Sequence, residues 1–233
     1  MPEYAAFEAA HQPAPDAGGE LACALEQAPA LLAAMQACAQ RHGVWLVPGS
    51  LPMRLGAGAT NRAPVIAPDG RVAFQDKRVV TPFEAGWGLT GGMAPKTFAT
   101  PWGQIGISIC YDAEFPAHVR AQVEAGAWLV LVPAATDSAA GASRVRIAAR
   151  ARALENQCFI AVAPTVGDAH WLAALDMNLG RAGVYAPPDM GMPEDGIVVE
   201  GDAGWIFADL DPARLEAVRT GGAVRNHRDW ARV

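Results

Sequence analysis

The residue best placed for chemistry is Cys110, which follows a β-branched run. Ile105, Ile107 and Ile109 alternate before it as in a buried strand, and Pro116 fits the first turn of a following helix. A thiol at such a junction lies near free backbone N–H groups and the positive end of a helix dipole, and both favour the thiolate. The sequence therefore predicts a nucleophilic cysteine. The alternative is a buried cysteine that acts as a small hydrophobic residue.

Two predicted hairpins place reactive residues at the ends of strands. Pro-Asp-Gly at 68–70 separates two strand-like runs, and the second run ends just before Lys77. Pro-Trp-Gly at 101–103 separates another pair, whose second strand leads to Cys110. Both residues are therefore expected at the ends of strands.

The other expected elements alternate between helix and strand, which predicts βαβ units. They are a helix over 21–41 that Pro29 divides or kinks and Gly43 ends, strands over 44–48, 128–132, 158–163 and 205–210, and helices over 116–125, 143–156 and 212–218. Residues 11–20, 166–200 and 221–233 are expected to form loops or a tail. Ligands of such sheets bind beyond the carboxyl ends of strands, where Cys110 and Thr136 lie.

Composition limits the classes of protein and partner. With 233 residues and 52% hydrophobic content, the chain is expected to form one α/β domain over residues 1–233. A formal charge of −6 argues against nucleic acid as a partner. The four cysteines show no CxxC spacing, so neither a metal site nor a disulfide framework is expected. No leader and no membrane-spanning run are recognised, so a cytoplasmic location without membrane contact is expected.

Four motifs together resemble the nitrilase superfamily of carbon–nitrogen hydrolases. They are Pro-Glu-Tyr at 2–4, Asp-Lys-Arg at 76–78 with Pro-Phe-Glu at 82–84, Ile-Cys-Tyr-Asp at 109–112 with Phe-Pro at 115–116, and Arg-Ala-Arg-Ala-Leu-Glu-Asn at 150–156. Their order and spacing are more specific than any one of them. Within the superfamily the chain is most similar to the Rim1-like branch. The resemblance implies a four-layer αββα sandwich, with no metal and no organic cofactor.

The resemblance also assigns a Glu-Lys-Cys triad to Glu3, Lys77 and Cys110. Glu3 would be the general base, and Lys77 would stabilise the oxyanion of a tetrahedral intermediate. The backbone N–H of Tyr111 would be a second oxyanion donor, and Glu84 would orient the site. The implied reaction is hydrolysis of a small-molecule amide at a non-peptide C–N bond, through a cysteine thioester.

Residues near the motifs bear on the substrate. Tyr111-Asp112 resembles amidases more than nitrilases, which more often carry Trp-Glu there. Glu114 stands where many amidase relatives have a basic residue, so it is expected to disfavour a substrate carboxylate by charge repulsion. Thr136 is a further candidate for substrate binding. A Cys-His dyad with His118 is not favoured, because nothing positions such a pair.

Relatives normally have another strand and helix before the Pro-Glu-Tyr motif, so this chain is expected to lack the first strand–helix unit. A start codon placed too late, or a truncated sequence, is favoured over natural loss of that unit. This form of the chain is expected to be less stable than a longer one.

Two other functions stay open, a catalytically impaired binding module and an acyltransferase that uses the same thioester. Relatives commonly pair near the segment 150–156, which predicts a homodimer or larger homo-oligomer.

Overall fold

The computed structural model describes residues 1–4, 7, 14, 16–202 and 204–233. Its elements, in chain order, are α1 (Ala17–His42), β1 (Leu51–Leu55), β2 (Gly58–Ile66), β3 (Val72–Asp76), α2 (Pro82–Trp87), β4 (Thr97–Thr100), β5 (Gly103–Ile107), the 3₁₀ helix η2 (Cys110–Glu114), α3 (Pro116–Glu124), β6 (Ala127–Ala134), α4 (Ala139–Asn156), β7 (Phe159–Pro164), β8 (Gly167–Asp168), β9 (Met177–Asn178), β10 (Ala182–Tyr185), β11 (Ile197–Gly201), α5 (Pro212–Gly221), α6 (Asn226–Asp229) and the 3₁₀ helix η3 (Trp230–Arg232). Of the predicted loop over 11–20, residues 11–13 and 15 lie outside the described residues, and residues 17–20 belong to α1.

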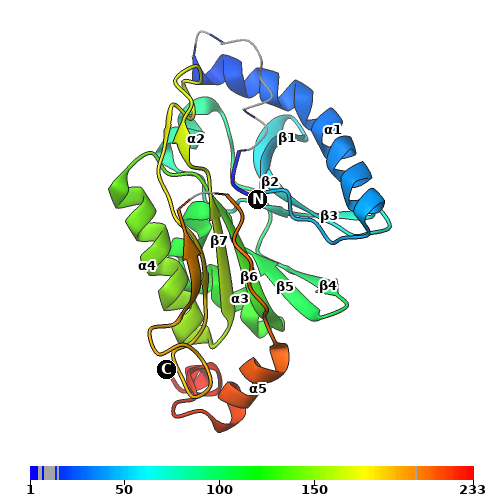
Figure 1. Ribbon diagram of the computed structural model, residues 1–233. Coiled ribbons are helices and arrows are strands. Elements are labelled where there is room, and N and C mark those ends of the chain that lie inside the picture. The colour runs from blue at the N-terminus through cyan, green and yellow to red at the C-terminus, as the bar shows by residue number, and fades with distance from the viewer. Residues whose placement is uncertain (5–6, 8–13, 15, 203) are drawn as a thin grey trace.

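Two sheets and their flanking helices position the site (Figure 1). The small sheet has the order β1-β2-β3, and helix α1 lies along it. The large sheet has the order β11-β10-β7-β6-β5-β4, with β5, β6 and β7 parallel. Helices α3 and α4 connect these parallel strands and pack on them, as right-handed βαβ units require. The α/β class is therefore confirmed, and the αββα layer order stays a prediction.

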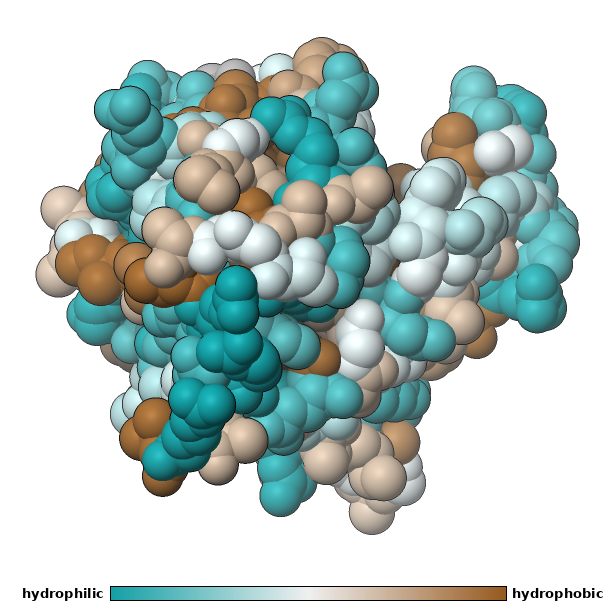
Figure 2. Space-filling model, turned by 90° about the horizontal axis from the view of Figure 1, so that it is seen from below, coloured by the Kyte–Doolittle hydropathy of each residue, from teal (hydrophilic) through white to brown (hydrophobic). Residues whose placement is uncertain are grey.

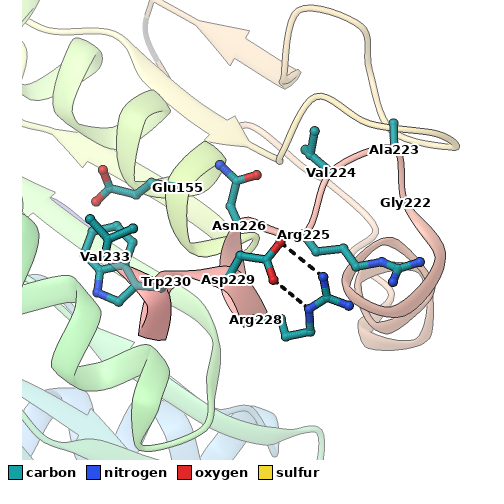
Figure 3. Close-up of a pocket in the computed structure, with 10 residues that line it drawn as sticks. All are labelled: Glu155, Gly222, Ala223, Val224, Arg225, Asn226, Arg228, Asp229, Trp230 and Val233. Carbon is teal, nitrogen blue, oxygen red and sulfur yellow. Dashed lines mark hydrogen bonds and ion pairs between the residues drawn. The ribbon is translucent and has the colours of Figure 1, made fainter.

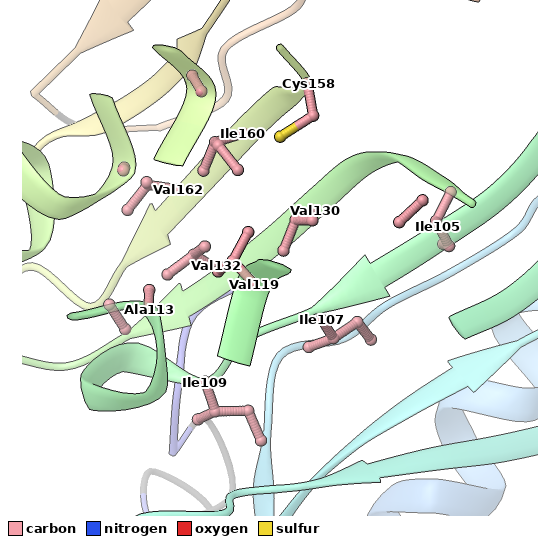
Figure 4. Packing of buried hydrophobic residues seen from close by; sticks show 14 of the residues in the cluster. Ile105, Ile107, Ile109, Ala113, Val119, Val130, Val132, Cys158, Ile160 and Val162 are labelled. Atoms are coloured by element: carbon pink, nitrogen blue, oxygen red, sulfur yellow. The ribbon is translucent and has the colours of Figure 1, made fainter. Parts of the chain in front are cut away.

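The core between the large sheet and its helices is built from β-branched residues (Figure 4). Ile107 of β5, Val130 of β6 and Ile160 of β7 are fully buried and belong to one cluster with Val119 of α3. Burying each such side chain stabilises the fold by about 1.5 to 3 kcal/mol relative to leaving it in water. This packing fixes the carboxyl ends of β5 and β6, from which Cys110 and the loop after Ala134 project.

Both predicted hairpins are confirmed. Strands β2 and β3 pair around the turn at 68–70, and β4 pairs with β5 around the turn at 101–103. Gly70 has φ of 85°, a left-handed conformation that favours glycine in the turn. The second hairpin ends at Ile107, two residues earlier than predicted, and the chain then turns toward Cys110.

Helix α1 differs from its prediction in length. It starts at Ala17 and continues past Pro29 as one helix, capped by Asp16 at its start and by Gly43 at its end. A proline inside a helix removes one hydrogen bond, but packing on β1 and β2 offsets that loss. By length and composition α1 could also cross a membrane, so the expectation that no such run exists is wrong. A single helix of this kind is weak evidence for a membrane protein, because helices of soluble cores pass the same test.

Four other predictions of local structure are wrong. The first concerns the tail over 221–233, which contains the short helices α6 and η3. The segment 44–48 forms one bridge, from Leu46 to Ile66, and the strand of this region is β1 instead. The segment 205–210 pairs with no strand among the described residues, and Trp205 and Phe207 are 77% and 83% exposed. The region 166–200, expected as loops, contains the short strands β8 to β11. Alternation of apolar residues predicted a strand at 205–210. A strand forms only where a neighbouring strand accepts and donates its backbone hydrogen bonds, and apolar alternation does not reveal such a neighbour.

Candidate active site

The seven residues singled out in the sequence line one cavity of about 750 Å³. They come from the N-terminal segment, the ends of β3, β5 and β6, and helix α2, and are Glu3, Lys77, Glu84, Cys110, Tyr111, Glu114 and Thr136. The fold thus brings together residues up to 133 positions apart in the chain. Aromatic residues Tyr4, Phe83 and Trp87 form one wall, and the segment 173–178 forms another.

Cys110 occupies a constrained turn. Strand β5 ends at Ile107, and η2 begins at Cys110 with φ of 47°, a conformation that residues with a side chain seldom adopt. The N–H of Asp112 donates to the carbonyl of Ile109 and closes this turn. The Cys110 thiol donates to the carbonyl of Ala135 at 3.6 Å. Backbone strain of this kind is typical of residues held in place for function.

The surroundings of Cys110 favour the neutral thiol over the thiolate that its position in the sequence predicted. A 3₁₀ turn separates β5 from α3, so the thiol does not lie at the first turn of that α-helix. Burial, assisted by the negative charge of Glu3, raises the pKa of the Cys110 thiol far above its ordinary value, although Lys77 opposes this. A neutral thiol must lose its proton as it attacks a substrate, so the site needs a base within reach.

Lys77 links two carboxylates in the interior. Its Nζ lies 2.8 Å from Oε1 of Glu3 and 2.7 Å from Oε1 of Glu84, and its side chain is 2% exposed. Burial opposes the charge on Lys77, but attraction to the surrounding acidic groups is stronger and raises its pKa. The ammonium ion is therefore retained beside the Cys110 thiol at all ordinary pH values.

The two carboxylates differ in their environments. Burial raises the pKa of Glu3 to about 7, against the opposing effect of Lys77. Burial also acts to raise the pKa of Glu84, but Lys77 and hydrogen bonds from Thr81 and Tyr4 outweigh it and lower that pKa. A carboxylate with pKa near neutrality is suited to accept and return a proton, whereas one held ionised is suited to orient Lys77.

Glu3 is held firmly although it lies at residue three. Its carboxylate accepts hydrogen bonds from Nδ2 of Asn61 at 2.9 Å and the N–H of Ala135 at 2.8 Å. Its own carbonyl accepts from Oγ1 of Thr165 at 2.8 Å. Gly49, with φ of 89°, lies so close that a Cβ there would approach the carbonyl oxygen of Pro2 to 1.7 Å. The segment that carries Glu3 thus lies where the two sheets meet (Figure 1).

Helix α2 places Glu84 by a capping box. The N–H of Glu84 donates to Oγ1 of Thr81, and the N–H of Thr81 donates to Oε2 of Glu84 at 2.7 Å. This leaves Oε1 of Glu84 for Lys77 and for the hydroxyl of Tyr4, which donates to it. The cap of one short helix therefore also orients the buried lysine.

Asp112 received no role in the sequence analysis, but it connects the two halves of the site. Its carboxylate accepts the N–H of Arg78 at 3.0 Å and of Val79 at 2.8 Å, immediately after Lys77. Nε2 of His118 lies 3.7 Å from the same carboxylate, and burial lowers the pKa of His118 to about 4, so this ring is neutral. The sequence signal for Asp112 was its place in the family motif at 109–112, two residues after the nucleophile.

Exchange of Asp112 for asparagine is expected to disturb this connection. The amide has one acceptor oxygen and presents N–H groups to a backbone donor, so one of the two hydrogen bonds is lost and a buried donor remains unpaired. We expect a loss of about 1 to 3 kcal/mol in unfolding free energy. Urea denaturation checks this value. Asp211→Asn, at the exposed N-cap of α5, is the control and is expected to retain nearly full stability.

Glu114 and Thr136, predicted to bind substrate, both line the cavity, and each also has a partner in the protein. Nε of Arg144, on α4, lies 3.4 Å from Oε1 of Glu114, so the acidic charge expected to face a substrate is paired. Thr136 is bound to the loop that forms the opposite wall, because its carbonyl accepts the N–H of Leu179 at 2.8 Å and its hydroxyl donates to the carbonyl of Leu179. Arg144 was missed in the sequence because it follows the nucleophile by 34 residues.

A second cavity, of about 690 Å³, lies at the C-terminal end of the chain (Figure 3). Its charged lining includes Arg228 and Asp229, which pair with each other at 2.7 Å, and it contains no cysteine. Viewed from the end of the molecule shown in Figure 2, hydrophobic side chains form separate groups among hydrophilic ones. The first cavity is therefore the candidate active site, because the cysteine nucleophile lines it.

Comparison with known proteins agrees with the motifs and the fold. Residues 1–219 match the carbon-nitrogen hydrolase family. The chain belongs to this family. It is 33% identical to "Probable hydrolase YhcX" of Bacillus subtilis over 198 residues, which cover 83% of this chain and 39% of that protein. It is 31% identical over 222 residues to a deaminated glutathione amidase of Synechocystis, covering 88% of this chain and 79% of that one.

Solved structures of other carbon-nitrogen hydrolases share the fold. A hydrolase from Helicobacter pylori G27 superposes with a TM-score of 0.76 at 21% identity, over 94% of this chain and 78% of that one. An amidase from Nesterenkonia gives a TM-score of 0.67 at 28% identity, over 88% of this chain and 74% of that one. This carbon-nitrogen hydrolase thus spans most of the length of these two structures but about two fifths of YhcX.

Proposed function

We propose that this carbon-nitrogen hydrolase cleaves small-molecule amides through a thioester on Cys110. The observation that carries the proposal is the buried contact of Lys77 with both Glu3 and Glu84 in the cavity that holds the thiol. Relatives are named as amidases, which supports the same class of reaction. Amide carbonyls are poor electrophiles, so hydrolysis needs a positioned nucleophile, a base and an oxyanion site together.

In the first half-reaction the sulfur of Cys110 forms a bond to the amide carbonyl carbon. The thiol proton passes to Glu3, and the carbonyl oxygen becomes an oxyanion near the ammonium of Lys77 and the N–H of Tyr111. When the C–N bond breaks, Glu3 returns the proton to the leaving nitrogen. Ammonia or an amine departs, and the acyl group remains on Cys110 as a thioester.

In the second half-reaction a water molecule attacks the thioester carbon while Glu3 accepts a proton from that water. The C–S bond then breaks, the carboxylic acid leaves, and the proton returns to Cys110. Ionisation of Lys77 is needed in both halves, because its charge is opposite to each developing oxyanion. Its burial strengthens this attraction, because little water screens it.

Two other functions compete with hydrolysis. An acyltransferase would use the same thioester but pass the acyl group to an acceptor other than water, and detection of a transferred acyl product would distinguish it. A binding module without catalysis would need no base, so the three hydrogen bonds that hold the Glu3 carboxylate favour an enzyme.

We also propose that two copies of the chain form a homodimer through α4. On this helix the apolar residues Ile147 and Leu154 are 64% and 46% exposed.

The proposed function is tested by ammonia release from a panel of primary amides, together with intact mass spectrometry of protein quenched during turnover. We expect an added mass equal to the acyl group, located on the peptide that contains Cys110. Cys38→Ala, which removes an exposed cysteine, is the matched control and is expected to keep the adduct. Ammonia release without any Cys110 adduct in slow-substrate experiments would count against the thioester.

The protonation of Glu3 is expected to determine how amide hydrolysis depends on pH. Because burial raises the pKa of Glu3 to about 7, its carboxyl is protonated below that pH and cannot accept the thiol proton. We therefore expect kcat/KM to rise as the pH increases through about 7 and to fall about tenfold per pH unit well below it. A steady-state profile from pH 5 to 9 checks this. A profile that is flat between pH 5 and 8 would remove Glu3 from the role of base.

The Glu114–Arg144 pair is expected to affect the preference of the site for neutral over negatively charged amides. Glu114→Gln leaves the guanidinium of Arg144 without its partner at the cavity wall, so an amide with a distal carboxylate gains an attractive contact. We expect its kcat/KM to rise about fivefold relative to a neutral amide of equal length, as an exposed ion pair of about 1 kcal/mol implies. Competition assays with the two amides measure this ratio. The double variant with Arg144→Gln should abolish the gain.

A further inference from the structure

Helix α1 carries a buried carboxylate that the proposed reaction does not use. Glu20 is 1% exposed, in the first turn of the helix. Its Oε1 accepts the N–H of Ala173 at 2.6 Å, and its Oε2 accepts the N–H of Ala174 at 2.8 Å. Both oxygens of one side chain are thus bound to consecutive backbone groups 153 and 154 residues away. Hydrogen bonds to an ionised acceptor are shorter and stronger than neutral ones.

The segment that Glu20 binds forms a wall of the active-site cavity. Residues 173–178 line the cavity together with Cys110 and Lys77. Strands β8 and β9 close the base of this loop, and the N–H of Ala169 donates to the carbonyl of Asp176 at 2.8 Å. Glu20 therefore holds the tip of a loop whose base is fixed by its own hydrogen bonds.

Apolar packing around Glu20 supports the same contact. Leu21 and Ala24 of α1 belong to one buried cluster with Leu172 and Leu175 of the loop and with Tyr4 beside Glu84. These apolar contacts hold the loop against the helix without specifying the direction of its backbone. The two hydrogen bonds to Glu20 do specify it, because hydrogen bonds are directional and apolar packing is not.

We propose that Glu20 is a positioning residue that sets the shape of the substrate-binding wall at 173–175. The inference rests on the proposed amidase function for its kinetic consequence, but its structural part does not. Glu20 lies behind the wall and lines no part of the cavity, so it acts on substrate binding through the loop and takes no part in the transfer of protons at Cys110.

The test compares Glu20→Gln with Glu26→Gln, a neighbouring exposed glutamate on the same helix. In Glu20→Gln one oxygen is replaced by an amide NH₂ that cannot accept either loop N–H. We expect KM for an amide substrate to rise about tenfold or more with kcat changed by less than about threefold, and Glu26→Gln to match the wild type. Iodoacetamide should alkylate Cys110 in Glu20→Gln at a rate within about twofold of wild type, since the triad is intact. An unchanged KM, or an equal loss of kcat and alkylation, would overturn the proposal.

Hydrogen exchange of the wild type gives a second test that needs neither activity nor a stable variant. The amides of Ala173 and Ala174 should exchange at least about 100-fold more slowly than unstructured amides at pH 7. Exchange of both at the unstructured rate would contradict the contact itself. Failure of the wild type to hydrolyse any amide, with both amides protected, would count against the proposed function and leave the Glu20 contact standing.

Discussion

Replacement of Cys110 by alanine is expected to reduce kcat/KM for amide hydrolysis by about 10⁴-fold or more. No other described side chain in the cavity is a thiol, so no thioester can form when this sulfur is removed. The proton that Glu3 would accept is lost with it. Alanine occupies the same constrained turn, and the loss of one buried sulfur is expected to reduce stability by only about 1 kcal/mol. Steady-state kinetics with a highly purified variant measure the effect.

Cys158→Ala is the matched control, because Cys158 is also buried and donates to a backbone carbonyl, that of Arg152. It lies immediately before β7, outside the cavity lining. Its removal creates a similar small void without touching the triad, so kcat/KM is expected to stay within about threefold of wild type. Retention of a tenth or more of the activity in Cys110→Ala would exclude the thioester mechanism.

Lys77→Met is expected to impair stability as well as activity. Methionine fills most of the volume of lysine but leaves Glu3 and Glu84 buried without their shared cation. Removing one partner of a buried ion pair costs about 3 to 5 kcal/mol, because the remaining charge is uncompensated. Urea denaturation at pH 7 measures this loss. The loss should shrink as the pH falls, because the two carboxyl groups then bind protons and no longer repel each other.

Lys96→Met is the control for this experiment. Lys96 is the chain's other lysine, and its side chain is exposed beside the ring of Phe98. The change should alter the unfolding free energy by less than about 0.5 kcal/mol. Equal stability of Lys77→Met and Lys96→Met at pH 7 would show that the interior carboxylates do not depend on Lys77.

Candidate site residues that belong to a local sequence motif could be predicted from the sequence. Cys110 at a strand end and Lys77 after a hairpin follow from turn residues and periodicity. Glu84 follows from the family motif alone, and the fold brings all three into one cavity. The α/β class followed from alternation of helices and strands. These features depend on neighbours within a few residues, which a single sequence displays.

Contacts between distant segments could not be derived in the same way. Arg144 pairs with Glu114 across 30 residues, and Glu20 binds Ala173 across 153. Neither pair has a motif. The thiol of Cys110 was expected to be ionised from its position near a helix, but burial determines its pKa, and burial depends on the whole fold. The strand expected at 205–210 failed for a similar reason, since strand pairing needs a partner that periodicity does not reveal.

The most direct test of the proposed site is the rate of iodoacetamide modification at each of the four cysteines as a function of pH, followed by peptide mass spectrometry. The described geometry predicts that Cys110 reacts fastest although it is buried, that its rate rises through pH 7 with Glu3, and that Glu3→Gln and Lys77→Met suppress it. Exposed Cys38 should follow the pH dependence of an ordinary thiol. Fastest modification at Cys38, with Cys110 inert at every pH, would contradict an activated nucleophile in this cavity.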